Sequence, residues 1–245
     1  MTPLLAVVPA RAGSKGVPGK NTARIAGRPW VDFTVAALER SLSVGAILLT
    51  TDDREIIDLY VNRKSIFLIE RPAELATDTA TTSEAVEHAL QSWEAAGHNL
   101  PRALLLAQPT TPLRTAADID AAYQLYLDSG GQSVISACRV DGMRHPKDMY
   151  RPREDGSTEL FISDPHDRTT RHDYEPLYQR NGAIYIVSTD YFRREKRLRS
   201  LTPLIYEMPW ERSINIDGPG DLLIAKALIE SGLLNTNSES KCKSS

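Results

Sequence analysis

Residues 4–21 read L-L-A-V-V-P-A-R-A-G-S-K-G-V-P-G-K-N, an apolar run that passes directly into a loop of glycine, proline and basic residues. The run Leu4–Pro9 predicts a buried first strand. Gly13, Gly16 and Gly19 follow it, and glycine lets backbone N–H groups approach an anion closely. In an open α/β sheet, the loop after the first strand is the usual phosphate site. The stretch therefore predicts a phosphate-binding loop.

The charges of this loop favour the same interpretation. Arg11, Lys15 and Lys20 are its only charged residues, and a polyphosphate needs such cations. Two common phosphate loops are excluded by the spacing. A Walker A loop would need a glycine and a hydroxyl where Ser14 and Asn21 stand, and the glycines lie three residues apart, which is no G-x-G-x-x-G pattern. The plain alternative is a solvated basic loop.

The rest of the chain alternates short apolar runs with helical patterns. Further strands are predicted at Ala46–Thr51, Ser65–Ile69, Ala103–Gln108, Ser133–Arg139 and Ala183–Val187. Helical stripes are formed by Val31, Val35, Leu38 and Leu42, by Val86, Ala89, Leu90 and Trp93, and by Ile119, Ala122, Tyr123, Tyr126 and Leu127. Several runs are apolar on both faces, as in parallel strands covered by helices. We therefore expect an α/β fold with a Rossmann-like, doubly wound, mainly parallel sheet.

Helix starts are marked by short polar signals. Thr81-x-x-Glu84 fits a capping box, and Thr115-x-x-Asp118 is a looser version. Near the end of the chain, Asp217-Gly218-Pro219 is expected to open a helix around Leu222–Ile229.

One segment breaks the alternation of strands and helices. Residues 140–180 are rich in Arg, Asp, His and Pro and contain only short apolar pieces. A loop of this length inside a domain usually serves a function or an interface. We interpret it as a small β-rich lobe inserted into a single domain that spans residues 1–234. Residues 235–245 are polar and are expected to form a disordered tail.

The overall composition limits the classes of partner and compartment. The formal net charge of −3 argues against nucleic-acid binding, which normally needs a basic surface. Cys138 and Cys242 are too few for a disulfide framework or a zinc site. No apolar stretch has membrane-spanning length, and the N-terminus lacks a signal-peptide pattern. We therefore expect a cytoplasmic protein that acts on a small anionic partner and has no membrane partner.

The first loop also resembles a family signature. The pattern P-A-R-x-G-S-K-x-x-x-x-K-N over residues 9–21 is similar to the N-terminal motif of the acylneuraminate cytidylyltransferases, with their legionaminate and pseudaminate relatives. Arg71–Ala76, Leu106–Arg114 and Arg180–Tyr185 resemble the later blocks of that family, in order. The resemblance implies a nucleotidyltransferase that joins CTP to a nine-carbon 2-keto acid sugar and releases pyrophosphate.

The same resemblance implies the nucleotide-binding residues. The triphosphate would be held by Arg11, Ser14, Lys15, Lys20 and Asn21. The region around the base would include Arg71, Ala80, Thr82 and Pro109. The resemblance makes Arg11, Lys20 and Asp217 the catalytic residues, since developing phosphate charge is best met by preorganised cations. A structural alternative for Thr81 and Thr82 is that they only cap the following helix.

For the sugar, the resemblance points to six positions, which are Gln108, Thr110, Lys147, Arg171, Asn181 and Tyr185. Lys147 and Arg171 fall in the inserted lobe, where they would meet the carboxylate of the acid. The family's lobe also mediates dimerisation and contributes residues to the partner's site, so a homodimer is implied. The alternative for a charged insertion is a solvated face.

The metal site departs from the family pattern. Ser213-Ile-Asn215-Ile-Asp217 stands where relatives show two aspartates, D-x-D, as Mg²⁺ ligands. An amide oxygen binds a hard cation without contributing negative charge. Asp217 is therefore expected to be the main protein ligand for Mg²⁺, with Asn215 beside it and a second metal site in doubt. Asp217 as a simple helix-start residue is the alternative.

Several functions stay open at this point. The resemblance favours a sialic acid as the acceptor, and a legionaminic, pseudaminic or octulosonic acid is the alternative. A nucleotidyltransferase for sugar phosphates is disfavoured by the P-A-R-x-G-S-K loop. A nucleotide-binding homologue without catalysis would have no reason to keep Arg11, Lys20 and Asp217.

Overall fold

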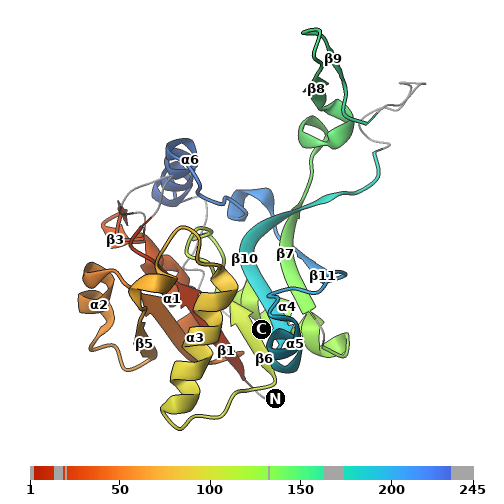
Figure 1. Ribbon diagram of the computed structural model, residues 1–245. Coiled ribbons are helices and arrows are strands. Elements are labelled where there is room, and N and C mark those ends of the chain that lie inside the picture. Colours follow the sequence, from red (N-terminus) through yellow and green to blue (C-terminus); the bar gives the residue numbers. More distant parts are fainter. Residues whose placement is uncertain (1–2, 14–18, 20, 132, 163–173, 233–245) are drawn as a thin grey trace, which may run out of the picture.

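A computed structural model of the protein describes residues 3–13, 19, 21–131, 133–162 and 174–232. Within them, seven strands form one sheet in the order β11-β7-β10-β6-β1-β4-β5 (Figure 1). These strands are β1 (Leu4–Pro9), β4 (Val44–Thr51), β5 (Ile66–Glu70), β6 (Ala103–Leu106), β7 (Ser133–Arg139), β10 (Tyr178–Ser188) and β11 (Leu204–Glu207). Only β10 runs antiparallel to its neighbours in this described sheet. The predicted mainly parallel α/β fold is confirmed.

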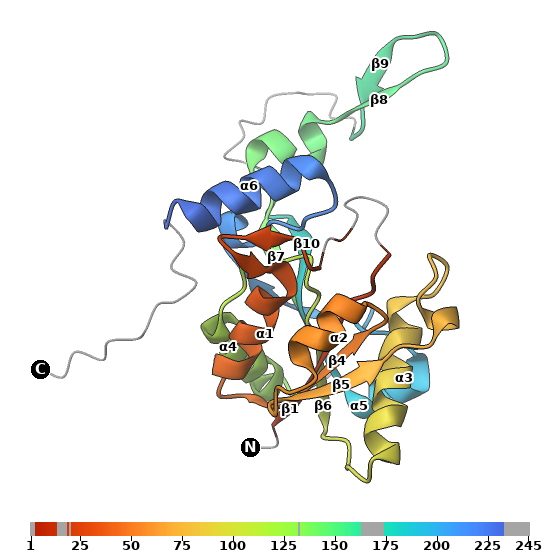
Figure 2. The same cartoon turned by 90° about the vertical axis from the view of Figure 1, so that its left-hand side faces the viewer.

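Helices cover both faces of the sheet. The helices are α1 (Trp30–Arg40), α2 (Arg54–Tyr60), α3 (Thr82–Ala95), α4 (Ala116–Asp128), α5 (Thr189–Glu195) and α6 (Pro219–Glu230). Figure 2 shows α1 and α4 on one side of the strands and α3 and α5 on the other. One buried apolar cluster joins the sheet to α1, α2 and α4, and a second joins it to α3 and α5. The fold is therefore doubly wound, as expected.

The first strand shows why its sequence is apolar without interruption. Leu4, Ala6 and Val8 belong to the cluster on one face of the sheet, whereas Leu5 and Val7 belong to the cluster on the other. Side chains alternate between faces along a strand, so a strand covered on both sides must be apolar at every position. Each fully buried Leu or Val side chain contributes about 1.5–3 kcal/mol. This burial fixes the position from which the following loop departs.

The predicted helix starts are confirmed in their hydrogen bonds. Thr81 Oγ1 accepts from the Glu84 N–H at 3.2 Å, and Glu84 Oε2 accepts from the Thr81 N–H at 2.6 Å. Thr115 and Asp118 make the same reciprocal pair. Helix α6 begins at Pro219, directly after Gly218.

Other elements were not expected from the sequence, namely α2, α5 and β11. Each is short, and β11 is a half-exposed strand whose burial does not alternate cleanly. Leu42 was wrongly placed on the first helical stripe. It is 95% exposed, because α1 ends at Arg40 and Ser41 already has extended backbone angles.

The inserted segment leaves the sheet after Arg139 and returns to it at Tyr178. It contains two short 3-10 turns, at Gly142–Arg144 and Pro146–Asp148. Beyond them, the strands β8 (Tyr150–Pro152) and β9 (Thr158–Leu160) form a hairpin. This lobe projects away from the sheet in both views (Figures 1 and 2). Residues 235–245, the expected tail, lie outside the described residues.

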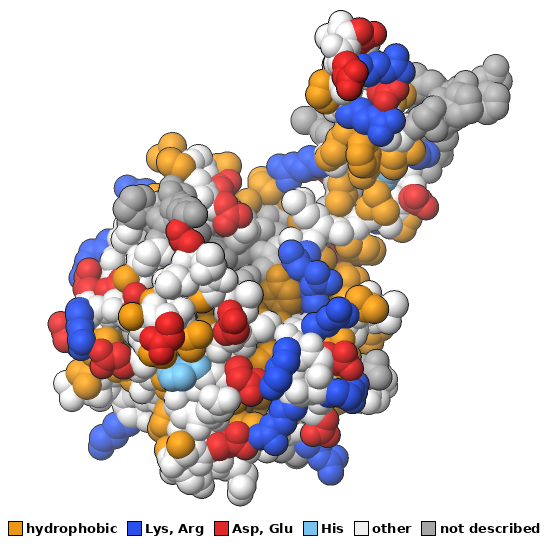
Figure 3. Space-filling view, in the orientation of Figure 1, with side chains coloured by type: hydrophobic (Ala, Val, Ile, Leu, Met, Phe, Trp, Pro, Cys, Tyr) orange, Lys and Arg blue, Asp and Glu red, His pale blue; other side chains and the backbone are white. Residues whose placement is uncertain are grey.

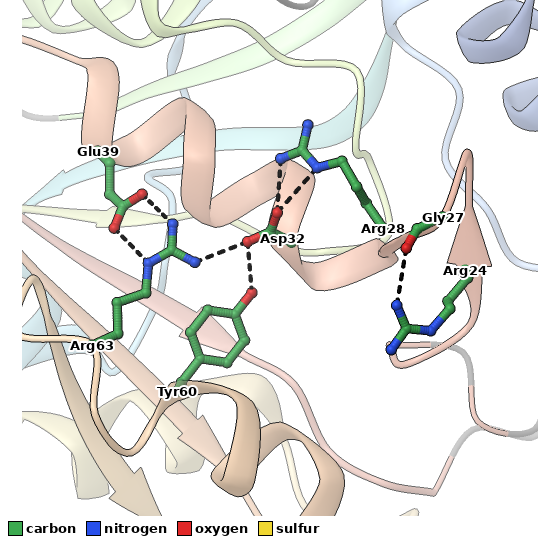
Figure 4. Close-up of polar contacts among 7 residues, drawn as sticks. All are labelled: Arg24, Gly27, Arg28, Asp32, Glu39, Tyr60 and Arg63. Atoms are coloured by element: carbon green, nitrogen blue, oxygen red, sulfur yellow. Dashed lines mark hydrogen bonds and ion pairs between the residues drawn. The ribbon is translucent and has the colours of Figure 1, made fainter.

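An ionic cluster links the hairpin and helix that follow the first loop to α2 and the turn after it. The hairpin of β2 (Arg24–Ile25) and β3 (Arg28–Pro29) leads into α1. Asp32 of α1 accepts hydrogen bonds from Arg28 at 2.7 Å, from Arg63 at 2.9 Å and from the Tyr60 hydroxyl at 3.1 Å (Figure 4). Burial raises the pKa of Asp32, but the hydrogen bonds from Arg28 and Arg63 outweigh it, so this pKa lies below its ordinary value. The cluster therefore needs Asp32 as a carboxylate.

None of the helices in the described residues is both long and apolar enough to span a membrane.

Candidate active site

A cavity of about 320 Å³ lies beyond the carboxyl ends of β1 and β6, the edge of an open α/β sheet where ligands bind. It is lined by Pro9, Arg11, Gly13, Asn21, Arg71, Ala80, Thr81, Thr82, Ala85, Gln108, Pro109, Thr110 and Asp217. Most of the positions chosen from the sequence for the nucleotide are therefore brought together in one place. Ser14, Lys15 and Lys20 lie outside the described residues.

The start of the first loop is tied to its surroundings through backbone and side-chain bonds. Asn21 Nδ2 donates to the Arg11 carbonyl at 3.0 Å, and the Ala12 N–H donates to Asp52 Oδ1 at 2.8 Å. The Arg11 guanidinium reaches across the cavity to the Thr77 carbonyl at 2.7 Å and to Asp78 Oδ1 at 2.9 Å. These bonds hold Arg11 at the cavity wall in a defined orientation.

Arg71 is the second arginine of this cavity, and it is buried at 6% exposure. Its Nη2 donates to the Thr50 carbonyl at 2.9 Å. Burial lowers the pKa of Arg71; the nearby Asp52 opposes this effect and the positive charge of Arg11 adds to it. Arg11 is paired with Asp78 at 2.9 Å, whereas Arg71 makes no ion pair with a carboxylate among the described residues. Arg71 is therefore the guanidinium of this cavity that is left for an anionic ligand.

The first turn of α3 adds further donors to the cavity wall. The Thr81 hydroxyl is used in the capping box, where it accepts from the Glu84 N–H and donates to Glu84 Oε2 at 2.8 Å. Thr82, the first residue of α3, makes no side-chain hydrogen bond among the described residues. Its hydroxyl is thus open to a ligand at a helix N-terminus, where partial positive charge favours anions. Of the two threonines, only Thr81 is used as the cap.

The loop after β6 is held by buried groups around Gln108. Arg114 is fully buried and donates to the Gln108 carbonyl and, at 2.9 Å, to Thr34 Oγ1. Burial lowers the pKa of Arg114 to about 9, against the opposing effect of Asp118. The Trp30 indole donates to the Pro109 carbonyl at 2.5 Å. These contacts give Gln108 and Pro109 a rigid support from beneath.

Gly182 is a residue of β10 whose backbone is approached closely by two side chains of the site. Its φ is +81°, in the left-handed region that favours glycine. A Cβ at this position would lie 3.0 Å from Gln108 Oε1 and 3.8 Å from Asn215 Oδ1. Gln108 and Asn215 therefore approach the same point of β10, and only a glycine leaves room for them there.

Asn215 and Asp217 lie together at the far side of the cavity. The Ile216 N–H donates to the Thr110 carbonyl at 2.8 Å, which fastens this segment to the loop after β6. Asn215 Nδ2 donates to Asp217 Oδ2 at 2.6 Å. In this arrangement the amide nitrogen of Asn215 faces the Asp217 carboxylate, and a half-turn of the amide would put its oxygen there instead.

This donor set fits Mg²⁺ only in part. Among the described residues, no group of three or more His, Cys, Asp or Glu side chains could hold a metal ion. Mg²⁺ is usually bound by one or two carboxylates together with substrate phosphates and water, rather than by an all-protein cage. One carboxylate and one amide oxygen beside an anion-binding cavity meet that requirement.

The positions chosen for the sugar are divided between several surroundings. Asn181 is buried, and its side chain is engaged with Ser213 Oγ at 2.8 Å and with the Ala183 N–H at 3.1 Å. Lys147 lies in the lobe, where its Nζ is 5.2 Å from the centre of the Tyr174 ring, and it lines neither of the cavities at the sheet. Arg171 lies outside the described residues.

Tyr185 lines a second cavity, of about 580 Å³, which shares Thr82 and Gln108 with the first. Its wall includes residues that the sequence reasoning missed, from the segment after α5. The signal for them was the run Lys196-Arg-Leu-Arg199, which carries three cations in four residues. The two cavities together offer adjoining places for two substrates.

Comparison with known proteins agrees with this arrangement. A family model described as cytidylyltransferase matches residues 5–211. The N-acylneuraminate cytidylyltransferase of Escherichia coli is 31% identical over 225 residues, which are 91% of this chain and 51% of that protein. The corresponding protein of Streptococcus agalactiae is 29% identical, again over 51% of its length. The chain thus spans about half the length of these curated relatives.

A relative of similar length is also found. The CMP-N,N'-diacetyllegionaminic acid synthase of Legionella pneumophila is 30% identical over 236 residues, which are 93% of this chain and 96% of that protein. Among solved structures, a CMP:2-keto-3-deoxy-manno-octonic acid synthetase complexed with CTP superposes with a TM-score of 0.67 at 14% identity. It covers 94% of this chain and 99% of its own, so the two share the fold.

Proposed function

The chain belongs to the cytidylyltransferase family, and from that premise we propose that it transfers CMP from CTP to a nine-carbon 2-keto acid sugar and releases pyrophosphate. The observation that carries the proposal is the cavity in which Arg11, Arg71 and the start of α3 face one another. Its cations and helix terminus match a triphosphate. The family relatives supply the choice of nucleotide and acceptor, since their names specify N-acylneuraminate and N,N'-diacetyllegionaminic acid.

The reaction requires positioning and neutralisation of charge rather than a protein nucleophile. The anomeric hydroxyl of the sugar attacks the α-phosphorus, the bond to the bridging oxygen of the β-phosphate breaks, and pyrophosphate leaves. Arg11, fixed by its bonds to Thr77 and Asp78, meets the charge that develops on the phosphates. Arg71 supports the same charge from its buried position. We place Lys20, Ser14 and Lys15 in this role from the sequence motif alone.

We propose Mg²⁺ as the cofactor, held by Asp217 with Asn215 beside it. The direct contact between these two side chains and the position of Asp217 in the nucleotide cavity support this choice. When bound, the ion neutralises phosphate charge and orients the oxygens to which it binds. Asp217 also lines a further cavity of about 400 Å³ with Asn215, so its carboxylate is reached from two sides.

The acceptor is proposed to occupy the second cavity. Because that cavity shares Thr82 and Gln108 with the first, a sugar bound there lies next to the phosphates of the nucleotide. Thr110 remains at the boundary on the nucleotide side, and Tyr185 forms the floor of the sugar side. Asn181 then has a supporting role. Its side chain accepts a hydrogen bond from the Ala183 N–H and so holds the backbone of β10 next to Gly182.

We further propose a homodimer formed through the lobe. Met149, Tyr150, Phe161 and Ile162 are exposed apolar residues of the lobe, at 46%, 64%, 57% and 40%. Figure 3 shows apolar side chains gathered on this projecting part of the molecule. A second copy would cover them and bring the cations of its own lobe, Lys147 and Arg171, toward the site. The expected cytoplasmic location is supported by the nucleotide substrate and by Cys138, a free buried thiol.

The test is pyrophosphate release with Mg²⁺, one of four nucleoside triphosphates, and one acid at a time. The acids are N-acetylneuraminic, N,N'-diacetyllegionaminic, pseudaminic and 2-keto-3-deoxy-octonic acid. Release with CTP and a nine-carbon acid supports the proposal. Release only with another nucleotide, release only with the eight-carbon acid, or no release with any pair overturns it.

A further inference from the structure

The wall of the second cavity, the one that Tyr185 lines, is unusually basic. Four basic residues line it, namely Arg180 at the start of β10 and Lys196, Arg197 and Arg199 after α5. Figure 3 shows Lys and Arg side chains gathered on this face, over α5 and β10. The whole chain carries a net charge of −3, so this concentration of positive charge is local.

Most of that charge is not neutralised within the protein. Lys196 pairs with Glu87 at 2.7 Å. Arg180, Arg197 and Arg199 make no ion pair with a carboxylate among the described residues. By contrast, Arg193 and Arg194 on α5, only a few residues away, pair with Glu94 and Glu195 and do not line this cavity. Among these arginines of β10, α5 and the segment after it, the ones without an ion pair in the described part of the chain are those that line the cavity.

Two of these arginines converge on one side chain of the cavity floor. The Arg180 guanidinium carbon lies 6.0 Å from the centre of the Tyr185 ring. Burial raises the pKa of Tyr185, while the charges of Arg180 and Arg199 both act to lower it. Arg180 and Arg199 therefore bring their charges to the same region from two different segments of the chain.

A buried hydroxyl at the same wall has no partner. Ser200 is only 5% exposed, and its Oγ makes no hydrogen bond among the described residues. Its backbone N–H is already used, donating to Ser133 Oγ at 3.2 Å. The Oγ atom itself is closed off from the cavity, so Ser200 serves this wall through its backbone and offers no side-chain atom to a ligand.

We propose that Arg180 and Arg199 hold the carboxylate of the acidic acceptor. The inference rests on the proposed function and makes it more specific, because it assigns the recognition of the acid to the same protomer that holds the nucleotide. A carboxylate accepts from two guanidinium groups at once. Its sugar ring then extends toward Gln108 and Thr82, where the second cavity meets the first.

This assignment differs from the one expected for the lobe. Lys147 lines neither cavity, and its Nζ lies against the Tyr174 ring. Within one chain, Lys147 is therefore not placed to meet an acceptor in either cavity. Arg180 and Arg199 are already at the wall within one chain. The acid is thus recognised before any partner contributes.

The inference is tested by removing the charge on each side of the contact in turn. The arginine is replaced by glutamine, and the acid is replaced by its methyl ester. R180Q, R199Q and S200A are compared with the wild type at saturating CTP, with N-acetylneuraminic or N,N'-diacetyllegionaminic acid and with the methyl ester of the same acid. R193Q is the matched control, since Arg193 is an exposed arginine of the same region outside the cavity. Arg180 and Arg199 are exposed, so their loss does not threaten folding.

R180Q and R199Q are expected to raise the KM for the acid roughly tenfold or more, the scale of a hydrogen bond to a charged group. S200A should leave it unchanged, because the Ser200 Oγ is closed off from the cavity. The KM for CTP and the KM for the ester should change less than twofold, and R193Q should match the wild type. Equal changes for acid and ester, or an R199Q protein that behaves like R193Q, would overturn the inference. Failure of the proposed function is distinct, because the wild type itself would then release no pyrophosphate with any acid.

Discussion

The amide nitrogen of Asn215 donates a hydrogen bond of 2.6 Å to the carboxylate of Asp217, whose side chain lines the nucleotide cavity. The amide supplies an oxygen but no charge, which leaves Asp217 as the only anionic protein ligand in this pair. The proposed metal site is therefore weaker than a pair of aspartates at the same positions would make it.

Replacing the amide by a carboxylate should strengthen that site. N215D is expected to lower the Mg²⁺ concentration needed for half-maximal activity several-fold, because a second anionic oxygen then faces the ion. Without metal, the two carboxylates repel one another, so Mg²⁺ should also raise the melting temperature of N215D more than that of the wild type. D217N should lose more than a hundredfold in kcat. Activity of D217N within threefold of the wild type would refute the ligand assignment.

The second prediction concerns Arg11. Its guanidinium is held in place by Thr77 and Asp78, so it is preorganised toward the charge of the transition state. R11Q is expected to lower kcat by roughly a hundred- to a thousandfold, as the loss of one preorganised donor does in other enzymes. R54Q serves as the control, because Arg54 makes an exposed pair with Glu70 and lines neither cavity. Steady-state kinetics with both variants decide the matter.

The third prediction concerns the close packing of Gln108 against Gly182. G182A places a methyl group 3.0 Å from Gln108 Oε1 and forces a non-glycine residue to φ +81°. We expect a loss of about 1–3 kcal/mol in the free energy of unfolding from the backbone strain, and a tenfold or larger fall in kcat/KM from displacement of Gln108. G156A is the matched control, since Gly156 has φ +83° and nothing within 4 Å of its would-be Cβ. It should share the strain and keep full activity.

The Asp32 cluster gives a prediction about pH. The pKa of Asp32 is lower in the folded protein than its ordinary value of 3.8. A carboxyl of this kind contributes stability that is fully present above pH 3.8 and is lost as the pH falls through the folded pKa. D32N lacks this contribution at every pH. Urea unfolding should therefore show a difference between wild type and D32N that is constant near pH 7 and shrinks below pH 3.8. A difference independent of pH in the acid range would contradict the assignment.

The proposed dimer is tested at the tip of the lobe. Tyr150 and Phe161 are more than half exposed, at 64% and 57%. The double variant Y150S/F161S should be monomeric by sedimentation at concentrations where the wild type is a dimer, since burial of such side chains drives association. L42S is the control, because Leu42 is a 95% exposed apolar residue that follows α1 and lies outside the lobe. A wild-type monomer would refute the proposal directly.

Much of the fold could be predicted from local patterns. The strand Leu4–Pro9 and the capping boxes at Thr81 and Thr115 depend on neighbouring residues, and the structure has them as expected. The edge strand β11 and the short helix α5 were missed, because their residues are only partly buried and show no clear period. The position of β11 depends on pairing with β7, and that of α5 on packing of Phe192 against β1, α3 and β6, all of which lie far away in the sequence.

The candidate site shows the same division. Arg11, Arg71 and Gln108 could be chosen from short motifs, since each motif fixes a strand end and the ends of neighbouring strands meet at one edge. The role of Arg180 and Arg199 could not, because nothing in either segment shows that both line one cavity. Nor does the sequence show that Ser200 is buried without a partner. Convergence of distant segments is a property of the fold alone.

The central claim is the transfer of CMP to an acidic nine-carbon sugar, and pyrophosphate release measures it most directly. With Mg²⁺, CTP and N-acetylneuraminic or N,N'-diacetyllegionaminic acid, we expect release that is abolished by omitting the acid and reduced at least a hundredfold in R11Q. The CMP-sugar should form in equal amount. Wild-type protein that binds CTP but releases no pyrophosphate with any acid would contradict the account.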